Sequence, residues 1–275
     1  MKKQKHLEWL LALPALLALG AGYLVPLALA FYKSLFAGMS TNFVGLDNYT
    51  DLFTNYAFGL AVKNLLRLWC IAIPLNLVLG VLLAVFCVEA AGPRLRLAFF
   101  FPGILPAACV VMMATEGASL LGLEDTWTFH EESALVWLGI VLWKTLGYTV
   151  LICAAFLESI PGEILDAAKL NGAGFWQCLF RVRLPLIRQG MVLSTVLVIF
   201  NGYRCFREAY LIGGEHPHEQ LYSLQHFLQN NFSNMNYARL EAASIVVVLA
   251  VLGAGILLLA LRRTAQRRAG HENKA

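Results

Sequence analysis

The chain has 275 residues, of which 59% are hydrophobic and only 14% are charged, and its mean hydropathy is +0.66. Soluble globular domains carry about 25% charged residues. The composition therefore excludes an ordinary water-soluble protein and indicates a chain that lies in a lipid bilayer. The formal net charge of +4 is too small to indicate nucleic-acid binding, so the distribution of the charges along the chain is the more useful observation.

Six segments reach the roughly 20 mostly apolar residues that a membrane-spanning helix needs. They are Leu7–Phe36, Asn64–Val88, Leu95–Glu116, Ala134–Leu157, Ile187–Ile212 and Leu240–Leu261. The first imitates a signal peptide, but its apolar run exceeds the 7–15 residues of a signal core, so an uncleaved span is expected. Spanning helices tolerate prolines such as those of the second and third segments. The predicted fold is all-α, a polytopic membrane protein with about six transmembrane helices.

Basic and acidic residues alternate between the segments that connect these spans. The basic ones gather in both tails and in the second and fourth connections: Lys2, Lys3, Lys5, Arg94, Arg96, Lys169, Arg181, Arg183, Arg188, Arg262, Arg263, Arg267, Arg268 and Lys274. The other connections carry acids: Asp47, Asp51, Glu124, Asp125, Glu131, Glu132, Glu215 and Glu219. Because Lys and Arg accumulate on the cytoplasmic side of short loops, both termini are expected in the cytoplasm.

The external segments, about 37–63, 117–133 and 213–239, are too short to form an independent domain. No GxxxxGK[ST] phosphate-binding loop occurs, so another chain must bind ATP and Mg²⁺ if ATP drives this protein. His216 and His218 form the one close histidine pair, which lacks the further ligands of a metal site. We therefore expect no metal, no cofactor and no catalytic residue in this chain.

The connection 158–188 looks unlike a span. Ser159 is suited to cap a helix whose first turn contains Pro161, and Asn171-Gly172 should end that helix because glycine accepts the left-handed conformation. A second short helix, about Phe175–Arg183, should then end at Leu184-Pro185. This two-helix projection could dock into a cleft of another protein, or it could lie on lipid headgroups as an amphipathic segment.

The same stretch resembles the cytoplasmic loop of permease subunits in ATP-binding-cassette (ABC) importers. Their motif reads E-A-A, three residues, G, nine residues, I, one residue, L-P. Here Asp166-Ala167-Ala168 is followed at the same spacing by Gly172, Val182 and Leu184-Pro185. Asp166 and Val182 depart from the family's Glu and Ile, and the shorter Asp166 must reach any ATPase partner differently. The resemblance implies that these residues couple the chain to a separate ATPase.

Other stretches resemble the sugar-permease branch of these importers, namely "VGLDNYTDLF" at Val44–Phe53, "IPGEILDAAKLNGAGFWQ" at Ile160–Gln177, and Gly213-Gly214. The resemblance implies a bacterial inner-membrane importer with ATPase subunits, a second permease, an extracytoplasmic solute-binding protein and a carbohydrate cargo. That branch usually pairs two different permeases, although a homodimer stays open. Residues 1–59 would form the first span and external loop, 60–262 the permease domain, and 263–275 a basic cytoplasmic tail.

Polar groups deep in a span are costly and often functional. Asn76, Lys144 and Asn201 lie at similar depth, about 10–13 residues from a span end, and Trp143 and Tyr148 neighbour Lys144. Together they could offer a sugar both hydrogen bonds and an aromatic face, or they could simply bond helix to helix. Arg204 lies nearer the outer end of its span, where it could gate the path, contact the binding protein or pair with Glu208 one turn on.

Three other functions are alternatives for a chain of this composition. An importer permease for a non-sugar solute would share every feature above. An ion-coupled secondary transporter or channel should show paired intramembrane acids or an internal repeat, and a membrane-embedded enzyme should show a His/Asp/Glu cluster. Neither pattern is visible in the sequence.

Overall fold

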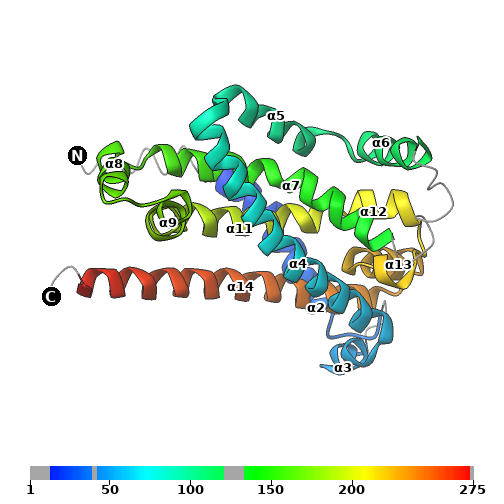
Figure 1. Cartoon of the computed structure of the whole chain (residues 1–275). Helices are drawn as coiled ribbons and strands as arrows, with labels where there is room; N and C mark the ends of the chain where they lie inside the picture. The colour runs from blue at the N-terminus through cyan, green and yellow to red at the C-terminus, as the bar shows by residue number, and fades with distance from the viewer. Residues whose placement is uncertain (1–12, 39–41, 121–132, 273–275) are drawn as a thin grey trace. The chain divides into compact units, whose positions relative to one another are not determined.

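The computed structural model describes residues 13–38, 42–120 and 133–272 (Figure 1). The chain forms two compact units, one made of residues 1–59 and 227–275, the other of residues 60–226. Among the described residues the sole β-pairing is an isolated antiparallel bridge between Phe36 and Phe43. Everything else that is regular is helical, which confirms the predicted all-α class.

The first unit pairs the two ends of the chain. It contains η1 (Gly20–Leu24), α2 (Val25–Lys33), α3 (Asp47–Thr54) and α14 (Tyr237–Glu272), and α14 packs against both α2 and α3. Asn48 Nδ2 donates to the carbonyl oxygens of Ser34 and Phe36, and the hydroxyls of Ser34 and Tyr49 are 2.6 Å apart. The segment resembling that of sugar permeases thus closes the turn behind the first span.

The second unit is built around the long helix α7, which packs against α5 and α11. Its elements are α4 (Tyr56–Phe86, which begins in the first unit), η2 (Cys87–Ala91), α5 (Pro93–Ile104), α6 (Ala107–Leu120), α7 (Ser133–Glu158), α8 (Gly162–Leu170), α9 (Phe175–Cys178), η3 (Leu179–Arg183), α10 (Leu184–Leu186), α11 (Arg188–Arg204), α12 (Phe206–Gly213), η4 (Glu219–Leu221) and the start of α13 (Leu224–Ser233). Figure 1 shows α7 between α5 and α11.

Two apolar clusters fill this unit, and α7 contributes to each. One joins α4, α6, α7, α12 and η4 through Leu68, Val110, Val111, Trp137, Ile140, Val141, Cys205, Ala209, Ile212 and Leu221. The other joins α4, α7 and η3 through Val81, Ala84, Val85, Cys153, Ala154, Leu157, Leu179 and Ile187. Since lipid tails are as apolar as these side chains, close packing rather than water exclusion holds the helices together.

Small residues make that packing possible. A Cβ atom on Gly147 of α7 would lie 2.3 Å from the carbonyl oxygen of Phe99 and 2.6 Å from Cα of Phe100, so α5 approaches at backbone distance. A Cβ on Gly190 of α11 would lie 2.7 Å from the Phe156 ring. The glycines therefore set the spacing between α7 and its two neighbours.

Some expected spans are confirmed and others differ in shape. Three described helices are long and apolar enough to cross a membrane, Leu13–Lys33, Tyr56–Ala90 and Ala134–Glu158, or five if each of two bent pairs counts as one span. The number six is thus not confirmed, although α14 contains the expected sixth segment. The second span begins eight residues earlier than expected, at Tyr56.

The third expected span is not one straight helix. Its two pieces, Arg94–Ile104 and Ala107–Gly117, are bent by 98° at Leu105-Pro106. Leu105 has extended backbone angles (φ −63°, ψ 136°) because the residue before a proline is driven out of the helical region. The expectation from the sequence is one span that tolerates its prolines, and the full break is a finding of the structure.

We expect Gly147→Ala to lower the free energy of unfolding by about 1–3 kcal/mol, the usual cost of overpacking, because its methyl group would collide with the α5 backbone. The measurement is the thermal unfolding midpoint of the purified protein in detergent. Gly139→Ala is the matched control on the same helix, because its Cβ meets nothing within 4 Å. Equal midpoints for the two variants would contradict the close approach of α5 and α7.

Candidate functional site: a projecting helix pair and a cationic cavity

The projection between the fourth and fifth predicted spans, here named the two-helix knob, comprises Gly162–Leu186. Its first helix, α8, ends in a Schellman motif, in which the N–H of Ala173 bonds to the carbonyl of Ala168 and that of Gly172 to the carbonyl of Lys169. Gly172 has φ +74°, so it supplies the left-handed conformation expected from the sequence. A Cβ there would meet nothing within 4 Å, so the constraint inside the chain is conformational.

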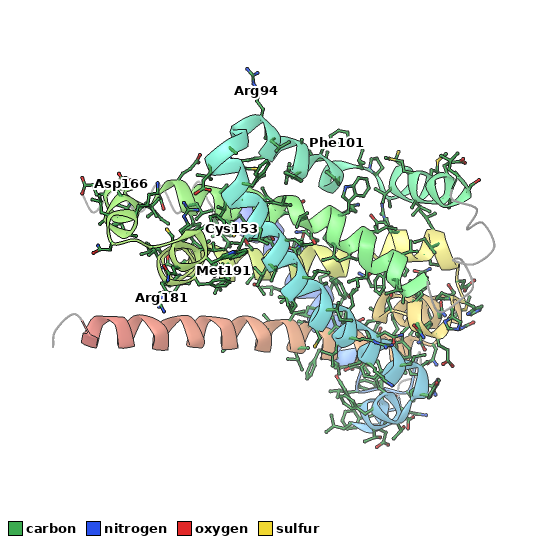
Figure 2. All side chains as sticks on the ribbon, in the orientation of Figure 1. Arg94, Phe101, Cys153, Asp166, Arg181 and Met191 are labelled. Atoms are coloured by element: carbon green, nitrogen blue, oxygen red, sulfur yellow. The ribbon has the colours of Figure 1, made fainter. Side chains whose placement is uncertain are left out.

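The knob presents its motif to the outside. Asp166 and Ala167 are exposed, and Figure 2 shows Asp166 pointing away from the neighbouring helices. Asp166 lies 4.0 Å from Lys169, but both side chains are mostly exposed, so this pair contributes little to stability. Trp176 and Phe180 stack on each other and are 59% exposed. The knob thus exposes two acids, Glu163 and Asp166, and three large aromatic rings, Phe175, Trp176 and Phe180, to solvent or to a partner.

Two details of the knob differ from the sequence expectation. Ser159 does not cap α8: its hydroxyl donates back to the carbonyl of Phe156, and Pro161 occupies the N-cap position. Leu184-Pro185 does not end the second helix, which continues through α10 and bends by 74° at Ile187. Leu184 packs against the second apolar cluster, so this part of the motif attaches the knob to the bundle.

Two ion pairs fasten the base of the knob. Arg183 of η3 pairs with Glu89 of η2, and Arg96 of α5 pairs with Glu158 at the end of α7 at 2.5 Å. Arg183 is buried, with its side chain 9% exposed. The sequence placed these charges in cytoplasmic connections but gave no signal for their pairing, because the partners are 94 and 62 residues apart.

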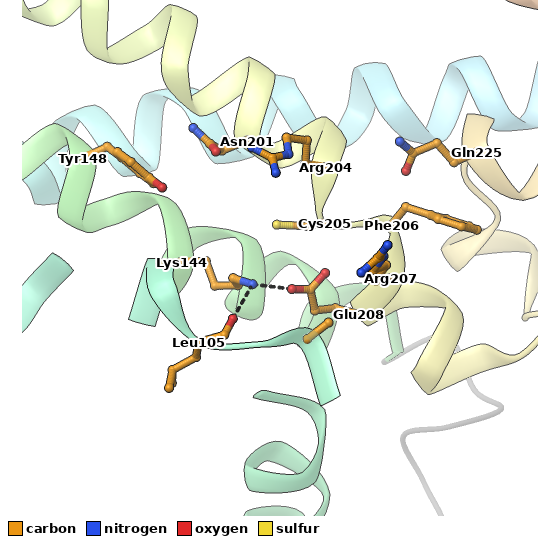
Figure 3. A pocket seen from close by; sticks show the side chains of 12 residues that line it. Leu105, Lys144, Tyr148, Asn201, Arg204, Cys205, Phe206, Arg207, Glu208 and Gln225 are labelled. Carbon is orange, nitrogen blue, oxygen red and sulfur yellow. Dashed lines mark hydrogen bonds and ion pairs between the residues drawn. The ribbon is translucent and has the colours of Figure 1, made fainter. Parts of the chain in front are cut away.

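A cavity of about 480 Å³ lies in the second unit, beside the middle of α7. Its lining comes from six elements and the breaks between them: Gly103, Leu105, Ala107, Lys144, Tyr148, Asn201, Arg204, Cys205, Phe206, Arg207, Glu208 and Gln225. Figure 3 shows the Lys144 and Glu208 side chains on one side of the cavity in this view, and Asn201 and Arg204 on the other.

Lys144 is the structural centre of this cavity. Its ammonium group donates to the carbonyl oxygen of Leu105 at 3.3 Å and pairs with the carboxylate of Glu208. The break before Pro106 leaves the Leu105 carbonyl without a helical partner, and Lys144 satisfies it. The side chains of Lys144 and Glu208 are only 14% and 2% exposed, so each charge depends on the other.

A second helix break lies directly beside the first. Cys205 interrupts the helix between α11 and α12 with ψ 20°, and its carbonyl oxygen accepts a hydrogen bond from Trp137 Nε1 at 3.3 Å. One helix, α7, therefore satisfies carbonyl groups at both breaks. The breaks in turn place Arg204, Phe206 and Arg207 around the cavity.

The remaining lining residue, Gln225, is positioned by a segment pinned to α4. Asn64 Nδ2 donates to the carbonyls of Glu219 at 2.6 Å and Tyr222 at 2.9 Å. Ser223 and His226 then cap α13 reciprocally, since each backbone N–H donates to the other's side chain. Burial lowers the pKa of His226 to about 4, so the ring is neutral and accepts through Nδ1.

The structure brings four of the six predicted path residues to one cavity, namely Lys144, Tyr148, Asn201 and Arg204. Asn76 and Trp143 do not line it. Asn76 is fully buried and bonds to Thr145 and Thr149 of α7, which is the helix-to-helix alternative left open by the sequence. Trp143 is 39% exposed on another face of α7.

The possible pairing of Arg204 with Glu208 is wrong, because Glu208 pairs with Lys144 instead. The sequence also missed Gln225 and Phe206 as lining residues. The sequence indicates that a lysine buried in a span needs an acidic partner. It does not show which of several acids is that partner, so it did not identify Glu208. Within the described residues, no three His, Cys, Asp or Glu side chains are arranged to hold a metal ion.

Residues 52–271 match the family described as the inner membrane component of binding-protein-dependent transport systems. The chain belongs to this family. It is thus an inner-membrane component of a transport system, and the expected identity as a type I ABC importer permease is confirmed.

Relatives match almost the whole permease. The osmoprotective compounds uptake permease protein GgtC of Synechocystis is 26% identical, over 91% of this chain and 96% of that protein. The sulfoquinovosyl glycerol transport system permease SmoG of Agrobacterium fabrum is 25% identical, over 92% and 88%. The fold matches a chain of a bacterial alginate ABC transporter with a TM-score of 0.77, 18% identity and 96% coverage of both chains.

We expect Lys144→Met and Glu208→Gln each to destabilise the permease by about 3–5 kcal/mol, because each leaves a buried charge without its partner. The double variant should be less destabilised than Lys144→Met alone, and the measurement is thermal unfolding in detergent. Lys169→Met is the control, since its pair with Asp166 is exposed and long. Additive losses in the double variant would show that the two charges do not depend on each other.

Proposed function

We propose that this permease forms the translocation path of an ATP-driven ABC importer for a carbohydrate that an extracytoplasmic solute-binding protein delivers. The observation that carries the proposal is the family's motif, Asp166 to Pro185, on an exposed knob of a chain that belongs to this family. Curated relatives are named for sulfoquinovosyl glycerol, starch degradation products and multiple sugars, which supports a carbohydrate cargo. GgtC, named for osmoprotective compounds, favours a non-sugar solute as the second candidate.

The knob is the proposed contact with the ATPase. Exposed Asp166, Ala167 and Gly172 would lie in the ATPase cleft, and the aromatic rings of Trp176 and Phe180 would lose water on docking. ATP-driven closure of two ATPase subunits would move the knob, and the ion pairs of Arg183 and Arg96 would transmit that movement to α4, α5 and α7. Transport then follows from a shift of population between two packings of the helices.

The cavity is the proposed part of the path that this chain contributes. Lys144, Tyr148, Asn201 and Arg204 would contact the cargo. Asn76 would act through α7, since it bonds to two threonines of that helix. Trp143 would face lipid or the second permease.

The orientation follows from the charges. With both termini in the cytoplasm, the knob faces the ATPase and the cavity lies toward the outer side. Residues 1–59 would provide the first span and external loop, 60–262 the permease domain, and 263–275 the basic tail. ATP and Mg²⁺ would be bound by the ATPase, so this chain would hold no cofactor and catalyse no reaction. The second permease is expected to be a different chain.

The proposed function is tested by uptake into liposomes that contain this permease with the companion permease and ATPase that co-purify with it. We expect uptake of a sugar to require ATP on the side of the membrane that carries the ATPase. It should also require the binding protein loaded with that sugar. A panel of radiolabelled sugars and small osmolytes identifies the cargo class. Uptake driven by an ion gradient without ATP would contradict the importer mechanism.

We expect Gly172→Trp to abolish ATP-driven uptake while the protein still inserts and assembles its helices. The residue needs φ +74°, and the added ring would project where the ATPase is expected to bind. Gly174→Ala is the control two residues away, because Gly174 has φ −70° and open space around it. Wild-type uptake by Gly172→Trp would show that the knob is not the coupling element.

A further inference from the structure

We infer that the cargo of this permease carries an anionic group, as a sugar with a carboxylate, sulfonate or phosphate does. The inference rests on the proposed function and specifies its substrate class. It comes from the balance of charges that line the cavity, where three cationic side chains meet one carboxylate.

The first step is to identify which charges are already neutralised. Lys144 pairs with Glu208, and that pair is nearly sealed from solvent. No carboxylate among the described residues forms an ion pair with Arg204 or Arg207, although both line the same cavity. Glu208 is the one acid in the lining, and it is engaged by Lys144. Both arginines are exposed, so the cavity presents two positive charges that no carboxylate of the described residues neutralises.

The second step concerns what such charges do within a membrane protein. Ionisable side chains that face a water-filled cavity of a membrane protein mark substrate or ion paths, and Arg204 and Arg207 are both exposed and line this cavity. Both unpaired cations are arginines, whose planar guanidinium groups match the geometry of carboxylate and phosphate oxygens with two parallel hydrogen bonds. A neutral sugar would leave both charges uncompensated, whereas an anionic sugar would neutralise them.

The third step is that the rest of the lining suits a sugar ring. Asn201 lines the cavity between Tyr148 and Arg204, and Phe206 adds an aromatic face. An amide and a phenol can bond sugar hydroxyls, and an aromatic face packs against the apolar C–H side of the ring. The volume of about 480 Å³ lies within the roughly 300–1,000 Å³ of small-molecule sites. The arginines would thus hold the acidic group, and the other side chains the ring.

Two other arrangements would also satisfy the arginines. Water in an open path could solvate them, or an acid of the second permease could pair with them in the assembled importer. In both arrangements the arginines would not distinguish acidic sugars from neutral ones. The transport experiment therefore separates these two arrangements from the proposal.

The test uses the complete importer in liposomes and matched pairs of sugars. Each pair joins a neutral disaccharide to its carboxylated, sulfonated or phosphorylated counterpart, for example galactobiose and digalacturonate. We expect an acidic member to be carried at least about tenfold faster than its neutral counterpart. Replacing both cations, Arg204→Gln with Arg207→Gln, should reduce that uptake about tenfold or more, while Arg204→Lys with Arg207→Lys should retain an intermediate rate.

The binding protein is the same in every variant, so a change in uptake between variants reports on the permease alone. Arg94→Gln is the matched control, because Arg94 is exposed and lies outside the cavity (Figure 2). Faster uptake of neutral sugars, or unchanged uptake of acidic sugars by the glutamine variant, overturns the inference and leaves the proposed function standing. Failure of every sugar, acidic or neutral, to enter with ATP overturns the proposed function as well.

Discussion

The ammonium group of Lys144 is the contact on which the second unit depends. It joins the carbonyl of Leu105, exposed by the break before Pro106, to the buried carboxylate of Glu208 on α12. Three segments far apart in sequence thus meet at one charge. Without that charge the broken span would present an unsatisfied carbonyl in a medium that cannot hydrogen-bond it, and the acid would be buried alone. The cavity exists because α7 makes two helix breaks tolerable, through Lys144 at Leu105 and through Trp137 at Cys205.

The same helix connects the cavity to the knob. Lys144 lies near the middle of α7, and Glu158 at its end binds Arg96, about 21 Å away at 1.5 Å per residue. Glycines at 147 and 190 hold α5 and α11 against α7 at close range. A movement at the knob would therefore reach the cavity through closely packed helices, with no flexible segment between.

The sequence was informative where a pattern is local or one-dimensional. Apolar runs located the spans, and motif spacing located the knob and its left-handed Gly172. It failed where rotation about a helix axis matters. Trp143 and Lys144 are neighbours in depth, but one residue turns a helix by about 100°, so they face different ways. Asn76 and Asn201 also lie at similar depth, and depth does not show which side of its helix each occupies. The three-dimensional structure shows that Asn76 bonds to α7 while Asn201 lines the cavity.

Glu89 and Arg183, the pair at the base of the knob, both lie in π-helical turns, Cys87–Ala91 and Leu179–Arg183. A π turn accommodates one residue more than an α turn. Losing that residue would convert the wide turn into an α turn and change the position of the charged side chain that the turn carries relative to its partner. Homologues of this permease should therefore accept substitutions in these two turns more readily than deletions of a single residue.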